Sequence, residues 1–175
     1  ADLGERKDKV ALSGFHPVYR DSSATMVHDF TVEWRPDPSK KRTVSFINVG
    51  DFITSLNSHY SVEGVWFDQW QSIEMRERLI DKGISAHEYR LTGSDYDGFK
   101  EMLYAKRVDL IAHEGLYQEL FSLVKKGDKV DHTDKSEKDI TDTVVGACKI
   151  LMQVSKSSGE ENYFGDVEII QENMN

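Results

Sequence analysis

The chain has 175 residues, of which 38% are hydrophobic and 30% charged, a composition typical of a single globular domain with a hydrophobic core. No apolar run approaches the about 18 residues that a membrane span requires, so no membrane partner is expected. The net charge of −9 argues against a general nucleic-acid-binding domain, which is usually basic, and the single cysteine, Cys148, excludes an internal disulfide.

The first half of the chain predicts strands, then a helix. The opening ADLG resembles the end of a strand, so we expect a fragment of a longer chain with a truncated first strand. Residues 9–19 and 25–36 are rich in β-formers, and the second range alternates apolar residues with a period of two, as a strand does. Residues 46–60 are expected to start extended and to become helical from about Val49.

The second half predicts alternating strands and helices. Residues 63–70 are short and apolar and predict a buried strand, of which the GVWFD part ends at Asp68. An amphipathic helix is expected from Ser72, with Gly83 as its stop. The remaining expected elements are a strand over 86–91, a helix over 95–107, an extended segment over 108–114, a helix over 116–126, a polar strand and loop over 128–138, and a helix from Ser136 to Val154.

This order of elements predicts an α/β fold in which helices flank a mixed sheet. Ligands gather at the carboxyl ends of strands in such sheets, which singles out Asp2 and Asp68. Asp139 and Asp142 lie three residues apart, on one face at the head of the last helix. Four carboxylates from three distant segments would repel one another unless a cation lies among them, and Mg²⁺ prefers oxygen ligands.

Each aspartate also has a purely structural interpretation. Asp2 suits a turn, Asp68 suits a helix cap, and Asp139 fits the fourth position of a capping box that begins at Ser136. A cap explains Asp142 poorly, because it lies one turn further along the helix beside an apolar stripe. The coincidence of all four favours metal ligands at the edge of the core.

Three segments resemble the ribonuclease H-like nuclease domain of viral large terminase subunits of the tailed-phage type. They are DLGERKDKVALSGF, GVWFDQWQS and VDHTDKSEKDITDTVVGA. The resemblance runs from Asp2 to about Val154 and is most specific in the last segment. There, Thr133 and Thr143 replace the family's usual proline and alanine. The paired aspartates of this segment also occur in Holliday-junction resolvases of the same superfold.

The resemblance implies a ribonuclease H-like nuclease domain over residues 1–154, followed by a weakly packed or mobile tail over 155–175. Such a domain is a metal-dependent endonuclease that cuts concatemeric viral DNA during genome packaging. Two Mg²⁺ or Mn²⁺ ions about 4 Å apart would activate a water and stabilise the leaving 3′ oxygen. The metal ligands would be Asp2, bridging both ions, Asp68 and Asp139, each holding one ion, and Asp142, completing the second site.

The implied partners are double-stranded DNA bound largely without sequence preference, an upstream ATPase domain of the same polypeptide, the small terminase subunit and the portal. The implied location is the cytoplasm of the infected host cell. No G-x-x-x-x-G-K-[ST] motif occurs, so the chain itself is not expected to hydrolyse ATP. Two alternatives stay open: a junction resolvase or transposase-like nuclease of the same fold, and a non-catalytic packaging module.

The acidity of the chain suits a nuclease that other parts of its machine hold on DNA. Basic groups occur at Arg6, Lys7 and Lys9, near the first aspartate, and residues 40–42 predict either a DNA-facing or a plain solvated loop. Asp8 is a weaker candidate ligand that more plausibly shapes a turn. His132 and Lys138 are candidates for approaching the site or a phosphate, and solvated surface positions explain them equally well.

Overall fold

The computed structural model describes residues 9–20, 23–37, 39, 43–68, 73–127, 129–133 and 137–157. Its elements are β1 (Val10–Arg20), β2 (Ser23–Trp34), α1 (Phe46–His59), β3 (Val65–Asp68), α2 (Ile73–Asp81), β4 (Ala86–Tyr89), α3 (Gly93–Tyr104), β5 (Val108–Asp109), α4 (Glu114–Ser122), β6 (Leu123–Lys126), β7 (Lys129–His132) and α5 (Asp139–Ser157). No helix in these ranges is long and apolar enough to cross a membrane.

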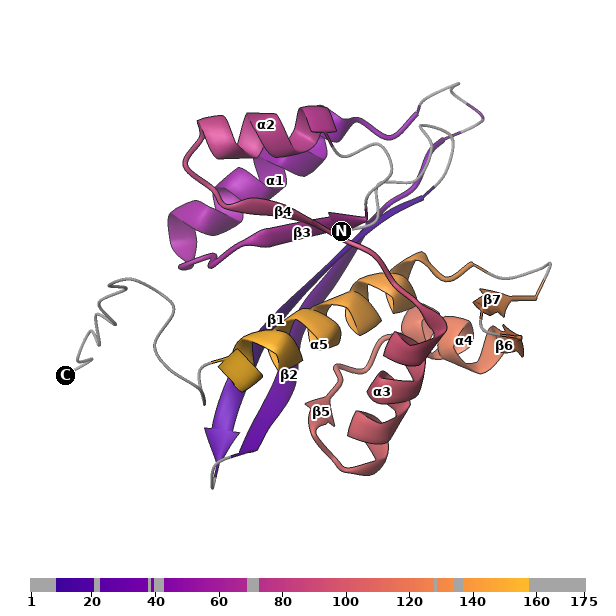
Figure 1. Ribbon diagram of the computed structural model, residues 1–175. Coiled ribbons are helices and arrows are strands. Elements are labelled where there is room, and N and C mark those ends of the chain that lie inside the picture. Colours follow the sequence, from indigo (N-terminus) through magenta and orange to yellow (C-terminus); the bar gives the residue numbers. More distant parts are fainter. Residues whose placement is uncertain are drawn as a thin grey trace.

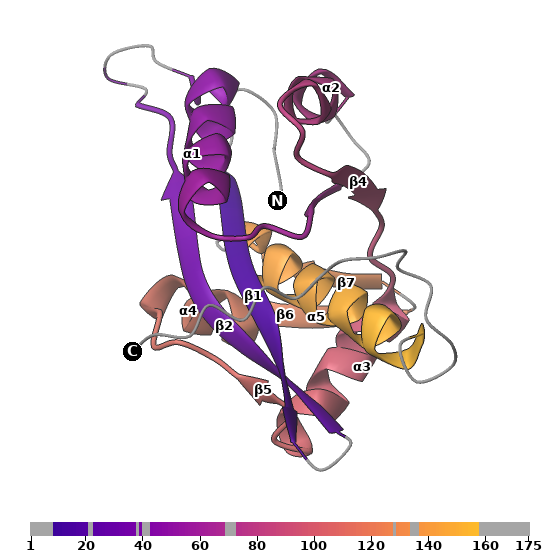
Figure 2. The ribbon, with the colours of Figure 1, turned by 90° about the vertical axis from the view of Figure 1, so that its left-hand side faces the viewer.

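The long β1–β2 hairpin runs through the middle of the molecule (Figure 1). On one side lie α1, α2, β3 and β4, and on the other lie α3, α4 and the three short strands β5, β6 and β7. Helix α5 packs along the hairpin and also contacts α3 and α4, an arrangement that Figure 2 shows from the side. The hairpin therefore connects two halves of the molecule.

Each half has its own hydrophobic core, and β1 contributes to both because its successive side chains point to opposite faces. Val10 and Leu12 join the core formed with α1, α2, β3 and β4. Ala11, between them, joins the core formed with α3, α4 and α5. This second core also contains Cys148, whose burial raises the pKa of the thiol to about 12.

The strands pair in three separate sheets within the described residues. β1 and β2 are antiparallel, with a register shift between Gly14 and Phe15, and β5 adds to β2 in parallel. β3 and β4 form a parallel pair, and β6 and β7 form an antiparallel hairpin. The predicted α/β class is confirmed, whereas the single mixed sheet expected from the sequence is not formed by the described strands.

Two predicted helix boundaries are wrong, for local reasons. Helix α1 begins at Phe46 rather than near Val49, because the Ser45 side chain accepts a hydrogen bond from the backbone N–H of Asn48 and caps the helix. The helix expected over 116–126 ends at Ser122. Its last residues instead form β6, which pairs with β7.

The last helix also differs from the expected range. It begins at Asp139, the fourth position of the expected capping box, whereas Ser136, the expected first residue, lies outside the described residues. It continues to Ser157, three residues past Val154, the predicted end of the domain. Residues 158–175 are outside the described part of the chain, so the division into a domain and a tail stays a prediction.

Candidate metal centre

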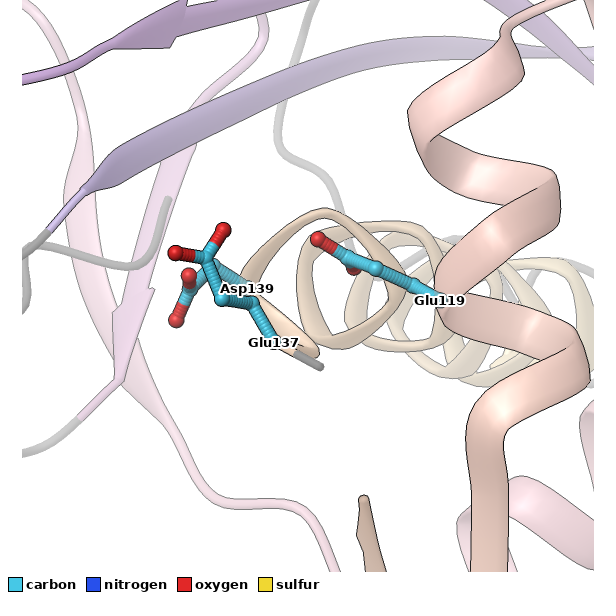
Figure 3. A group of neighbouring side chains, drawn as sticks. All are labelled: Glu119, Glu137 and Asp139. Atoms are coloured by element: carbon cyan, nitrogen blue, oxygen red, sulfur yellow. The ribbon is translucent and has the colours of Figure 1, made fainter. Parts of the chain in front are cut away.

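Three carboxylates from two elements meet at the head of α5. Asp139 is the first residue of this helix, Glu137 lies just before it, and Glu119 extends toward both from α4 (Figure 3). One oxygen of each lies within 4.8 Å of the others, and among the described residues this is the group that could hold a metal ion. Glu119 is buried, Asp139 is half-buried and Glu137 is exposed, so the group lies at the edge of the core.

Glu119 connects α4 to the start of α5. Its side chain is almost inaccessible, since the residue is only 5% exposed. One carboxylate oxygen accepts a hydrogen bond of 2.8 Å from the backbone N–H of Thr141, and the other accepts one of 2.6 Å from Lys9 Nζ. A carboxylate is stabilised at a helix N-terminus by the helix dipole and by the unpaired backbone N–H groups there. Glu119 therefore acts as a tertiary cap for α5.

Lys9 places an ammonium group among the acidic side chains. The residue is 4% exposed, and its Nζ lies 2.6 Å from Glu119, 3.0 Å from Glu137, 3.5 Å from Glu33 and 3.6 Å from Asp139. Burial alone lowers the pKa of Lys9, but its hydrogen bonds to Glu119 and Glu137 outweigh burial and raise the pKa above its ordinary value. The same contact with Lys9 outweighs the effect of burial on Glu137 and lowers the pKa of that carboxyl.

The four carboxylates around Lys9, which we call the acidic group, belong to Glu33, Glu119, Glu137 and Asp139. Within the described part of the chain, this group has more negative charge than its neighbouring cations balance. The Arg35 guanidinium is the second cation, 2.7 Å from Glu33 and 3.5 Å from Glu137. Among the described residues, the four carboxylates that contact Lys9 carry a formal charge of −4 against +2 from Lys9 and Arg35, which leaves −2. Hard carboxylate oxygens with this excess suit Mg²⁺ or Mn²⁺.

Asp142 does not belong to this group. It is 9% exposed and lies one turn along α5, facing α3. The Tyr96 hydroxyl donates to one of its oxygens, and Lys138 Nζ donates to the other over 3.0 Å. The same ammonium lies 5.9 Å from the centre of the Tyr96 ring. In the structure Asp142 thus connects α5 to α3.

Of the four predicted ligands, Asp139 lies in the acidic group. Asp68 ends β3 as predicted, but it is not a member of the group. Asp2 lies outside the described residues, as do Arg6 and Lys7. The site of four aspartates therefore stays a prediction.

The candidate basic residues that the structure describes lie in different environments. Lys9, one of the basic groups noted near the first aspartate, is buried among carboxylates. Lys138 is held by Asp142, and the His132 ring hydrogen-bonds the carbonyl oxygen of Thr133 over 2.9 Å.

Neither a protein-family model nor a curated protein sequence matches the chain. A search of solved structures finds the crystal structure of the HK97 bacteriophage large terminase, with a TM-score of 0.63 and 16% sequence identity. The chain has a terminase-like fold. The match covers 82% of this chain and 37% of that one, so the chain spans well under half the length of the terminase. At this identity the likeness concerns the fold alone.

Hydrogen-bonded hydroxyl groups connect α5 to the β1–β2 hairpin. Ser13 of β1 hydrogen-bonds Thr143 of α5 over 2.7 Å and Thr31 of β2 over 2.8 Å. Thr31 in turn bonds the buried ring of His28 over 2.8 Å. Thr143, which departs from the terminase motif, therefore has a structural role that an alanine could not perform.

Glu119 and Glu137 were not foreseen from the sequence. Glu119 lies on the same helical face as Leu116, three residues earlier, and a charged residue on a buried stripe needs a partner. The position of Glu119 on this buried stripe was the sign in the sequence that its carboxylate has a partner. Glu137 precedes Asp139 by two residues, and the run of acidic residues at a helix start was visible, but the pattern of paired aspartates drew attention to Asp142 instead.

Proposed function

We propose that the chain is the nuclease part of a DNA-packaging terminase, a metal-dependent endonuclease that cuts concatemeric viral DNA. One coincidence carries this proposal. The segment that most resembles terminase nucleases in sequence, residues 130–147, supplies Asp139 to the group of carboxylates at the head of α5. The terminase-like fold supports the proposal independently of the sequence motifs.

Asp139 is the ligand on which the sequence motif and the spatial grouping agree. Glu137 would share the ion, since its carboxylate is exposed at the same helix start. Glu119 is the least available ligand, because both of its oxygens already accept hydrogen bonds. Asp2 and Asp68 are proposed as further ligands from the sequence alone, because both are expected at strand ends and both fall in the segments that carry the resemblance. Bound Mg²⁺ or Mn²⁺ would activate a water and stabilise the leaving oxygen of the phosphodiester.

The proposed substrate is double-stranded DNA, contacted through its backbone without strong sequence preference. The chain is acidic, so its own affinity for DNA is expected to be weak and to fall steeply with salt. We propose that an upstream ATPase domain, the small terminase subunit and the portal hold it on DNA in the host cytoplasm. The HK97 protein that it resembles is a large terminase more than twice as long as the matched region.

Plasmid cleavage in Mg²⁺ or Mn²⁺ tests the proposal. The chain should nick and then linearise supercoiled plasmid, and a chelator should stop the reaction. Asp139→Asn and Asp68→Asn should nearly abolish cutting while the circular dichroism spectrum stays that of the wild type. Asp51→Asn is the matched control, because this exposed aspartate on α1 pairs with Arg78 and belongs to no acidic group.

Two outcomes would contradict the proposal or redirect it. Cutting by Asp139→Asn at the wild-type rate would exclude the head of α5 as the metal centre. Cleavage of four-way junctions in strong preference to linear duplex would favour the resolvase alternative over the terminase.

A further inference from the structure

The ammonium of Lys9 lies in the middle of the ion pairs of the acidic group, within 3.6 Å of all four carboxylates. It is within 3.6 Å of Asp139 and 3.0 Å of Glu137, the two residues proposed to hold a metal ion. It contacts Glu119 and Glu33 as well, so four carboxylates share one buried cation. A lysine this deeply buried is rare unless it is paired.

A divalent ion bound to Glu137 and Asp139 would compete with this ammonium. Lys9 contacts one oxygen of each residue, and two cations a few ångströms apart repel strongly at the edge of a protein core. Arg35 is not an equivalent competitor, because its side chain is 59% exposed and it contacts Glu137 at 3.5 Å. A lysine head group is a compact point charge on a flexible stem, which suits it to leave such a site.

We propose that Lys9 is an internal counter-cation, which neutralises part of the charge of the acidic group in the metal-free protein and is displaced when a divalent ion binds. This inference rests on the proposed metal centre and adds a means by which metal binding to it would be regulated. Lys9 makes the group stable without metal and lowers its affinity for metal. The side chain immediately precedes β1, so it can move out of the group without breaking the β1–β2 ladder.

Manganese binding to the whole chain, followed by electron paramagnetic resonance or calorimetry at low ionic strength, tests the inference. Lys9→Met should bind Mn²⁺ at least about tenfold more tightly than the wild type, because the competing charge is gone. Lys9→Arg keeps the charge and should bind close to the wild type. Lys125→Met is the matched control, since Lys125 is an exposed lysine that pairs with Asp97 outside the acidic group.

Amine labelling of the wild type gives a second readout that needs no variant to fold. Without metal, Lys9 should react slowly with an amine-reactive reagent, as judged by mass spectrometry. Saturating Mn²⁺ should raise its reactivity severalfold while that of Lys125 stays constant. If Lys9→Met fails to fold, this labelling experiment decides alone.

The outcomes separate the inference from the proposed function. Equal Mn²⁺ affinity in the wild type and Lys9→Met, with Lys9 labelling unchanged by metal, would overturn the displacement while leaving the metal centre intact. Tight binding by Lys9→Arg equal to that of Lys9→Met would overturn it too, since charge would not be the cause. Absence of Mn²⁺ binding by every variant would overturn both the inference and the metal centre.

Discussion

Replacing the buried Glu119 by the isosteric amide, Glu119→Gln, tests whether this side chain holds the lysine and the head of α5 together. The carboxylate accepts from two donors at once, Lys9 Nζ and the backbone N–H of Thr141. The amide has a single acceptor oxygen. Whichever donor it accepts from, its NH₂ group faces the other donor and leaves that donor unsatisfied in a site that is 5% exposed.

The expected loss of stability is about 2–3 kcal/mol. A hydrogen bond to a charged group contributes roughly 1.5–3 kcal/mol, and a buried donor left unpaired costs roughly 1–3 kcal/mol. The loss stays below the sum of these values, because Lys9 keeps its contacts with Glu33, Glu137 and Asp139. For a domain of this size, the melting temperature should fall by roughly 4–12 °C.

Urea unfolding followed by circular dichroism, with thermal melts alongside, measures the change. Glu101→Gln, at an exposed position of α3, is the matched control and should stay within about 0.5 kcal/mol of the wild type. A double-mutant cycle with Lys9→Met should show a coupling of about 1–3 kcal/mol between the two positions. A loss in Glu119→Gln no larger than that in Glu101→Gln would refute the role assigned to this carboxylate.

Three further predictions concern the support of α5 and a buried histidine. Tyr96→Phe removes the hydroxyl that donates to Asp142 and should cost about 1–2 kcal/mol in urea unfolding; an unchanged midpoint would deny that this bond stabilises the fold. Gly146→Ala would place a Cβ 2.5 Å from a ring carbon of Tyr89, so we expect a loss of about 1–3 kcal/mol, and a stability equal to the wild type would show that the ring moves freely. Burial lowers the pKa of His28 below its ordinary 6.5, so the unfolded chain binds the proton more readily and stability should fall as the pH decreases below 6.5. Melts across this range should show a smaller decrease in His28→Gln, and an identical decrease would assign it to other groups.

Local features of this protein were predictable because their causes lie within a few residues. The period-two pattern of residues 25–36 predicted a strand, and Met26 and His28 on the predicted face are buried while Val27 between them is only half-buried. Gly83 was predicted as the stop of α2, and it adopts a positive φ of 76° just after that helix. The strand ending at Asp68 was also predicted, because a short apolar run bounded by polar residues has few other interpretations.

The sequence by itself thus determined the α/β class and most elements, because hydrophobic period and turn residues are read from neighbouring positions. It also singled out Asp139, which the structure places in a group of carboxylates. The partners of each charge were decided only by the tertiary structure. Lys9 and Glu119 are 110 positions apart, and nothing in either neighbourhood indicates that the folded chain closes this distance to 2.6 Å. Long-range packing also gave the two aspartates at the head of α5 different neighbours. It placed Asp139 beside Glu119 and turned Asp142 toward Tyr96, because residues three apart on a helix share a face only approximately and meet different neighbours.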